Sequence, residues 1–91
     1  MEQDKELKDL PFVVVKRLET VELKSKSGEV FYKSQLIYET DKGTSVIITY
    51  FRDKDLYEDM IQIPLYKDFK LFYEVGFLDN QFKIIPVACS L

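Results

Sequence analysis

Residues 29–52 read EVFYKSQLIYETDKGTSVIITYFR and contain two runs rich in β-branched and aromatic side chains, separated by a short polar segment. The first run, Glu29–Glu39, places large side chains on both faces of a strand, because successive side chains point to opposite faces. Asp41-Lys42-Gly43 is a turn signal, and Ser45–Arg52 forms the second run. The stretch therefore predicts a β-hairpin.

Before this hairpin the pattern is also that of a strand. Apolar and charged residues alternate from Phe12 to Leu23, and the run is broken at Gly28. The parity of the apolar positions shifts between Val15 and Val21, so that one face of a regular strand cannot hold them all. We therefore expect a long first strand with a bulge or a bend in its middle.

After the hairpin, residues 53–68 are acidic and contain a proline, with helical character at best over Lys54–Met60. Phe69–Phe77 alternates cleanly as a fourth strand, and a short turn separates it from a fifth, Gln81–Ala88. Pro86 lacks an N–H group, which predicts that the fifth strand ends there or lies at an edge of the sheet.

The expected fold class is all-β, a small five-stranded barrel. The OB-fold is a five-stranded, partly open barrel of this size, and an SH3-like barrel fits the strand count nearly as well. With 91 residues and 10.8 kDa, the chain is long enough for one core. We expect a charged tail over residues 1–9 and a single domain over residues 10–91.

Several kinds of site are excluded by composition. The chain has no histidine, one cysteine (Cys89) and three glycines that lie far apart. Histidine-dependent nucleophilic catalysis, histidine or thiolate metal sites and glycine-rich phosphate loops are therefore ruled out. We expect a protein that is not an enzyme and that has no metal, no cofactor and no small-molecule substrate.

Charge and hydropathy indicate the compartment and the surface. No apolar run reaches the roughly 20 residues that span a bilayer, and a single cysteine leaves no intrachain disulfide framework, so we expect a cytoplasmic protein away from membranes. The net charge is −3, but residues 16–33 carry +2 and residues 53–68 carry −3. The positive segment belongs either to a mixed, solvated surface or to a basic edge suited to phosphates.

Aromatic residues favour the second interpretation. Tyr32 and Tyr38 share one face of the second predicted strand, and Phe31 projects to the other face beside Lys33. Phe72 lies between two charged residues on a face that should be polar. Proteins that bind single-stranded nucleic acid combine rings on which bases stack with cations that follow the backbone. The alternative is that these rings belong to the core or to a dimer interface.

Three short motifs, residues 24–28 (KSKSG), 35–38 (QLIY) and 84–86 (IIP), add a family resemblance. Together they resemble the gene V proteins of filamentous bacteriophages, small OB-fold proteins that coat single-stranded DNA as cooperative homodimers. The resemblance extends over residues 12–86 and joins short motifs across gaps. It implies a homodimer that binds single-stranded DNA.

The resemblance also implies roles for single residues. Tyr38 matches a tyrosine that the family places at the DNA surface, and Tyr32 falls at or next to a further DNA-contacting position. Lys24 and Lys26 lie in the loop that contacts phosphates in the family. The long aromatic hairpin that the family has after its fourth strand is reduced here to residues 77–80.

We therefore expect a protein that binds single-stranded DNA, or RNA, largely without sequence preference, in phage or mobile-element replication. Nine residues are expected to contact the nucleic acid: Lys16, Arg17, Lys24, Lys26, Phe31, Tyr32, Lys33, Tyr38 and Phe72.

Two alternatives remain open. One is an adaptor or inhibitor that binds a protein through Phe72, Tyr50 and Phe51 as an aromatic patch. The other is an acidic mimic of DNA, for which a net charge of −3 is modest.

Overall fold

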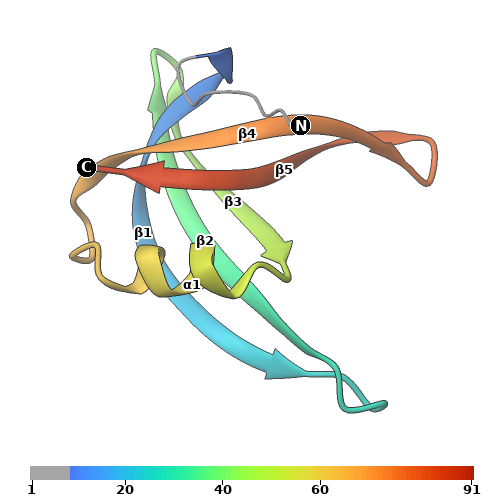
Figure 1. The fold of residues 1–91 in the computed structure, drawn as a ribbon. Helices are drawn as coiled ribbons and strands as arrows, with labels where there is room; N and C mark the ends of the chain where they lie inside the picture. Colours follow the sequence, from blue (N-terminus) through green and yellow to red (C-terminus); the bar gives the residue numbers. More distant parts are fainter. Residues whose placement is uncertain (1–8) are drawn as a thin grey trace.

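The computed structural model describes residues 9–91 as five strands and one helix (Figure 1). The elements are β1 (Phe12–Lys24), β2 (Val30–Thr40), β3 (Gly43–Phe51), α1 (Lys54–Ile61), β4 (Asp68–Leu78) and β5 (Gln81–Ser90). The expected all-β class, the five strands and the short helix are thus confirmed. The predicted tail over residues 1–9 lies, apart from Asp9, outside the described residues.

The five strands form one antiparallel sheet in the order β3-β2-β1-β4-β5. The chain passes from β3, at one edge, through α1 to β4 beside β1. The sheet is not closed into a barrel, which corrects that part of the prediction, because β3 and β5 are its two edge strands. In Figure 1 the tip of the β4–β5 hairpin extends beyond the rest of the domain, and β5 is not paired with β3.

Strand β1 contains the predicted irregularity. Its register with β2 shifts between Arg17 and Glu19, which is a β-bulge or a similar distortion. The first part of β1, Phe12–Lys16, pairs with β4, whereas the part from Lys16 onward pairs with β2. The bend thus lets one strand belong to both halves of the curved sheet.

The core fills the concave side of this sheet. Its buried members come from all strands except β5 and from the helix region: Val15, Tyr32, Leu36, Phe51, Leu56, Met60, Ile63, Phe69 and Leu71. The side chain of Asp53 caps α1, since its Oδ1 accepts hydrogen bonds from the N–H groups of Asp55 (2.9 Å) and Leu56 (3.2 Å). The helix buries Leu56 and Met60, which share a face at a spacing of four residues.

Arg17 connects the bulge to the end of the helix. One guanidinium nitrogen, Nη2, donates to the carbonyl oxygens of Ile63 (2.5 Å) and Ile61 (3.3 Å), and the Arg17 carbonyl accepts from Tyr66 N–H (3.0 Å). Carbonyls at a helix C-terminus lack partners within the helix, so a buried cation is well placed there. Burial lowers the pKa of Arg17 from its ordinary value, but a guanidinium stays protonated.

Both two-residue hairpin loops match their sequence signals. In the β4–β5 loop, Asp79 and Asn80 have φ values of 52° and 63°, as a type I′ turn requires at both positions. The flanking residues Leu78 and Gln81 pair directly. In the β2–β3 loop, Thr40 pairs with Gly43.

The role of Arg17 can be tested through stability. We expect Arg17→Ala to lower the free energy of unfolding by about 2–3 kcal/mol, because the helix-end carbonyls lose a charged, buried donor. Arg52→Ala is the matched control, since Arg52 is exposed and its removal should change stability by less than about 0.5 kcal/mol. Urea denaturation followed by circular dichroism measures both, and equal effects would contradict a structural role for Arg17.

Candidate nucleic-acid interface

The outer face of strands β2 and β3 is the main exposed surface with aromatic and basic side chains. Residues directly opposite in an antiparallel pair share a face. Lys33 lies opposite Tyr50, whereas the buried Tyr32 lies opposite the buried Phe51. The outer face therefore carries Lys33, Gln35 and Ile37 from β2 and Tyr50, Ile48 and Val46 from β3. The three β3 residues are all at least half exposed.

A shallow hollow lies at one end of this face, beside the β1–β2 turn. Its volume is about 260 Å³, and it is lined by Ser25, Glu29, Phe31, Tyr50, Phe51 and Arg52. The rings of Phe31 and Tyr50 form one side, with centroids 6.2 Å apart and planes inclined by 47°. Tyr50 is 58% exposed, so its ring is open to a ligand.

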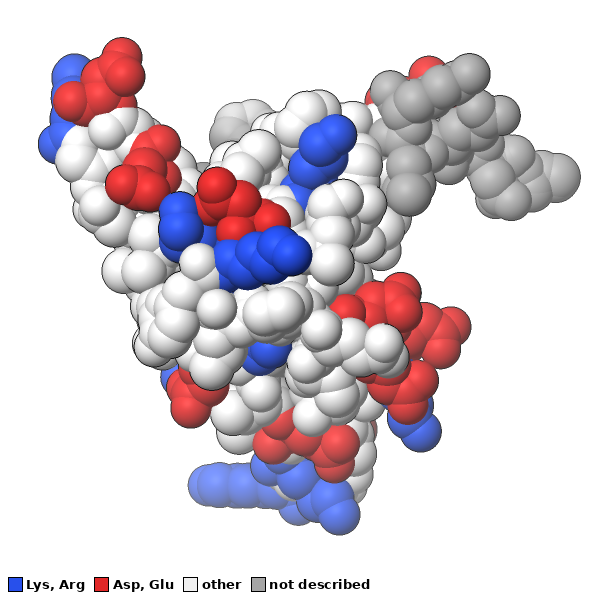
Figure 2. All heavy atoms as spheres, turned by 90° about the vertical axis from the view of Figure 1, so that its left-hand side faces the viewer, with Lys and Arg blue, Asp and Glu red and all other residues white. Residues whose placement is uncertain are grey.

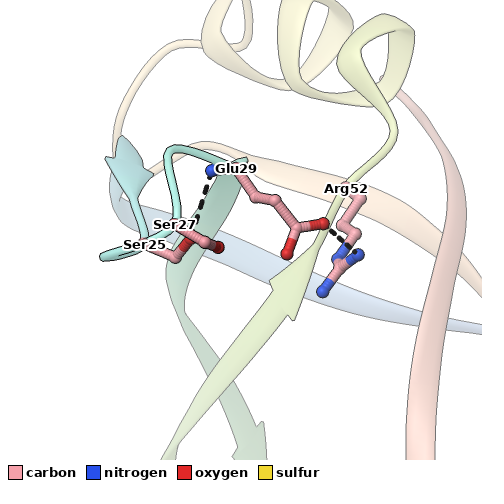
Figure 3. A network of polar contacts seen from close by, with 4 residues as sticks. All are labelled: Ser25, Ser27, Glu29 and Arg52. Atoms are coloured by element: carbon pink, nitrogen blue, oxygen red, sulfur yellow. Dashed lines mark hydrogen bonds and ion pairs between the residues drawn. The ribbon is translucent and has the colours of Figure 1, made fainter.

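Polar contacts hold the turn next to the hollow (Figure 3). Ser25 N–H donates to the Glu29 carbonyl (2.8 Å), and Glu29 N–H donates to Ser25 Oγ (3.1 Å). The Glu29 carboxylate reaches across to β3, where Arg52 Nη1 donates to its Oε2 at 3.2 Å. Glu29 and Arg52 thus form an exposed ion pair at the rim of the hollow.

Two lysines lie at the same turn. Lys24 ends β1 and Lys26 lies in the turn; both are exposed and form no ion pair within residues 9–91. In Figure 2, basic side chains gather at the lower end of the molecule, the level at which Figure 1 shows the β1–β2 turn. Elsewhere on the face seen in Figure 2, a mainly acidic group lies at the right, and acidic and basic side chains are mixed in the upper part.

Three of the nine predicted contact residues, Lys26, Phe31 and Lys33, lie on this surface or in the turn at its end. Lys24 pairs with Val30 at the end of β1 and so shares the face of the buried Tyr32, and the other five lie elsewhere. Arg17 and Tyr32 are buried, at 8% and 4% exposure. Tyr32 packs in the core against Phe51 and stacks on Tyr57, with ring centroids 4.2 Å apart. A buried ring offers no face to a nucleobase, and the Arg17 guanidinium is bound to the carbonyls of Ile61 and Ile63. Both residues are therefore structural.

Phe72 is also buried, at 9% exposure, and its ring packs against Phe12 at a centroid distance of 5.7 Å. The register of β4 with β5 shifts between Phe72 and Tyr73. The extra residue of this shift, Val87, is in β5, so the alternation along β4 is not interrupted. Phe72 faces away from Leu71 and is buried because Phe12, its partner on β1, packs against it.

Lys16 and Tyr38 lie together at a different place, a small hollow near the far end of β2. Lys16 Nζ contacts Asp68 Oδ1 (2.7 Å) and Glu39 Oε1 (3.2 Å). Hydrogen bonds to Asp68 and then to Glu39 raise the pKa of Lys16 above its ordinary value. Its charge is already paired, and Tyr38 is half-buried against the core.

Tyr50, Ile48 and Arg52, which line or flank the candidate surface, were not among the residues predicted to contact nucleic acid. The β2–β3 turn in the sequence contained the information needed to place Tyr50 and Ile48. Once Thr40 is paired with Gly43, the antiparallel register places Tyr50 opposite Lys33 and Ile48 opposite Gln35.

A second, larger groove separates β3 from the projecting hairpin. Its volume is about 580 Å³, and it is lined by Ile47, Ile48, Thr49, Tyr50, Leu78, Phe82, Lys83, Ile84 and Ile85. Phe82 is 78% exposed and meets Phe77 edge-on, with ring centroids 5.0 Å apart. Lys83 is the one charged residue of this lining, so the groove is predominantly apolar.

Other chemistry is sparse in the part of the chain that the structure describes. Burial raises the pKa of the Cys89 thiol to about 11, so it is protonated near neutral pH. Residues 9–91 contain no group of three or more metal-binding side chains and no helix that is long and apolar enough to cross a membrane. Comparisons with protein-family models, curated proteins and solved structures give no match.

The different positions of the two tyrosines predict a large effect on stability for one and almost none for the other. Tyr32→Ala should lower the free energy of unfolding by about 3–5 kcal/mol, as for other large aromatic residues removed from a core. Tyr50→Ala should change it by less than about 0.5 kcal/mol, because Tyr50 is exposed. Thermal and urea denaturation of both variants measures these changes. If Tyr50→Ala were strongly destabilised and Tyr32→Ala kept its stability, the assignment of Tyr32 to the core and of Tyr50 to the exposed face would be wrong.

Proposed function

We propose that this domain binds single-stranded nucleic acid, DNA or RNA, on the outer face of β2 and β3. The observation that carries the proposal is the open ring pair of Phe31 and Tyr50. It lies beside Lys33 and beside a turn with two lysines that form no ion pair within residues 9–91. Rings of this kind stack on bases of any sequence, and each such contact contributes about 1–3 kcal/mol.

The arrangement of the strands supports the proposal. The order β3-β2-β1-β4-β5, with a helix between β3 and β4, is compatible with an OB-fold. That fold binds oligonucleotides on the face of its second and third strands and with the loops after the first and fourth strands. The open ring pair lies on the equivalent face, and Lys24 and Lys26 lie at the equivalent first loop.

The net negative charge is compatible with such binding because affinity depends on the local field. Acidic side chains gather on and before α1, including Asp53, Asp55, Glu58 and Asp59, and α1 packs against the concave side of the sheet. The outer face of β2 within Phe31–Ile37 carries Lys33 and no acidic residue, and Glu29, at the end of this face, is paired with Arg52. A phosphate chain on this face therefore passes at a distance from the acidic helix.

A second candidate function, binding of a protein partner, is favoured by the groove between β3 and the hairpin. Its lining is apolar, and exposed apolar surface of this extent is common at protein interfaces. The predicted aromatic patch is reduced, since Phe51 and Phe72 are buried and only Tyr50 is exposed. A homodimer through this groove belongs to the same candidate function.

Loss of the Tyr50 ring should weaken nucleic-acid binding specifically. We expect Tyr50→Ala to raise the Kd for a labelled oligo-dT of about 20 nucleotides by roughly ten-fold, because one stacking contact is lost. Fluorescence anisotropy at low salt, with duplex DNA as competitor, measures the change. Tyr66→Ala, at an exposed tyrosine after α1, should bind as the wild type does. Equal affinity of all three proteins would exclude the β2–β3 face.

The lysines of the turn should appear in the salt dependence. Each phosphate contact adds about 0.7 to the slope of log K against log salt for a single strand. The double variant Lys24→Ala/Lys26→Ala should therefore have a slope shallower by about 1.4. Lys54→Ala/Lys67→Ala removes the same charge near α1 and should leave the slope unchanged.

An unchanged slope in the first double variant would remove the β1–β2 turn from the binding surface. Absence of any binding at low salt would overturn the nucleic-acid proposal as a whole and favour the protein-binding candidate. An apolar interface at the groove would show little dependence on salt, because few counterions are released.

A further inference from the structure

An acidic residue, Glu29, lies at the end of the surface proposed for nucleic acid, beside the β1–β2 turn. It lines the same hollow as Phe31 and Tyr50. A carboxylate at this place repels phosphates, so it reduces rather than adds to general affinity for the backbone. Its position is better suited to a ligand group that donates hydrogen bonds, and the hydrogen-bond donors of a nucleic acid are on its bases and sugars.

The structure holds this carboxylate in a defined orientation. The backbone of Glu29 is fixed by its two hydrogen bonds to Ser25, and Arg52 Nη1 binds Oε2 at 3.2 Å. The other oxygen, Oε1, has no hydrogen-bond partner among the described residues, and Figure 3 shows it directed away from Arg52. The side chains of Glu29 and Arg52 are 61% and 75% exposed, so both are accessible to a ligand.

We propose that the hollow at the β1–β2 turn holds a guanine base of the bound strand, with the Glu29 carboxylate as acceptor for its N1–H and N2–H groups. This inference rests on the proposed function and adds a base preference at one position of the site. The ring of the base lies against Phe31 and Tyr50, and its Watson–Crick edge faces the rim. Arg52, beside Glu29, supplies the N–H donor that guanine O6 accepts.

Guanine fits this pair of residues better than other bases because of its donor pattern. It has two adjacent N–H donors next to a carbonyl oxygen, so one carboxylate accepts twice while the neighbouring guanidinium donates. Cytosine and adenine present one amino group on this edge. Thymine and uracil present one N–H between two carbonyl oxygens, which a carboxylate repels. Single-stranded bases are commonly recognised on these edges while stacked on aromatic rings.

The test compares two short oligonucleotides that differ at one base. Fluorescence anisotropy is measured with an oligo-dT of about 8 nucleotides and with the same strand carrying one central dG, a length within the range of a single site. The wild-type protein should bind the dG strand about three- to ten-fold more tightly, the range expected for a base contact in a shallow, solvated site. Glu29→Gln should bind both strands equally, because an amide places a donor against guanine.

Glu58→Gln is the matched control, since it makes the same charge change on α1 and should keep the preference. Equal binding of both strands by the wild-type protein would overturn the guanine assignment and leave the proposed function in place. A preference that persists in Glu29→Gln would overturn the role of Glu29. Binding of neither strand would overturn the proposed function itself. Guanosine monophosphate that competes at the concentration of the dG strand would identify a free nucleotide as the ligand and overturn the single-strand assignment.

Discussion

The hydrogen bonds from Arg17 to the carbonyl oxygens of Ile61 and Ile63 connect the parts on which the rest of the structure depends. Arg17 lies at the register shift of β1, where the strand leaves β4 and turns toward β2. The same side chain fixes the end of α1, and α1 supplies Leu56 and Met60 to the core. One buried cation thus couples the bend of the sheet to the helix that covers its concave side. Because a buried charge without partners is costly, this arrangement is strongly specified.

The division between the two faces of β2 follows from that coupling. With α1 held against the concave side, Tyr32 stacks on Tyr57 and becomes part of the core. Phe31 and Lys33, its sequence neighbours, are then directed to the outer face. The candidate site is therefore a consequence of core packing, because the exposed aromatic and basic side chains of β2 are the sequence neighbours of a buried residue.

The sequence was sufficient to predict the local structure but not the face on which a ligand could bind. Alternation, turn residues and the parity shift in β1 indicated all five strands, the bulge, the helix and the position of Pro86 in an edge strand. Alternation alone shows which residues share a face of β2, but not which face is buried, since both faces carry aromatic rings. The burial of Phe72 depended on Phe12, which packs against it from β1, and the burial of Arg17 depended on contacts with carbonyls more than forty positions away. Only tertiary packing contains that information.

The exposed apolar residues around Tyr50 link the two candidate functions. Val46, Ile48 and Tyr50 are at least half exposed on β3, and Phe82 faces the same groove. A soluble monomer rarely leaves such a continuous apolar surface uncovered. Stacked bases would cover the end near the β1–β2 turn, where lysines are close, but the part that faces the hairpin has only Lys83 to attract a phosphate. The charge distribution therefore favours the turn for the proposed nucleic acid. It favours the groove for the second candidate, an apolar protein surface such as a second copy of the chain. Tyr50 lines both places, so it is the residue through which occupation of one would affect binding at the other.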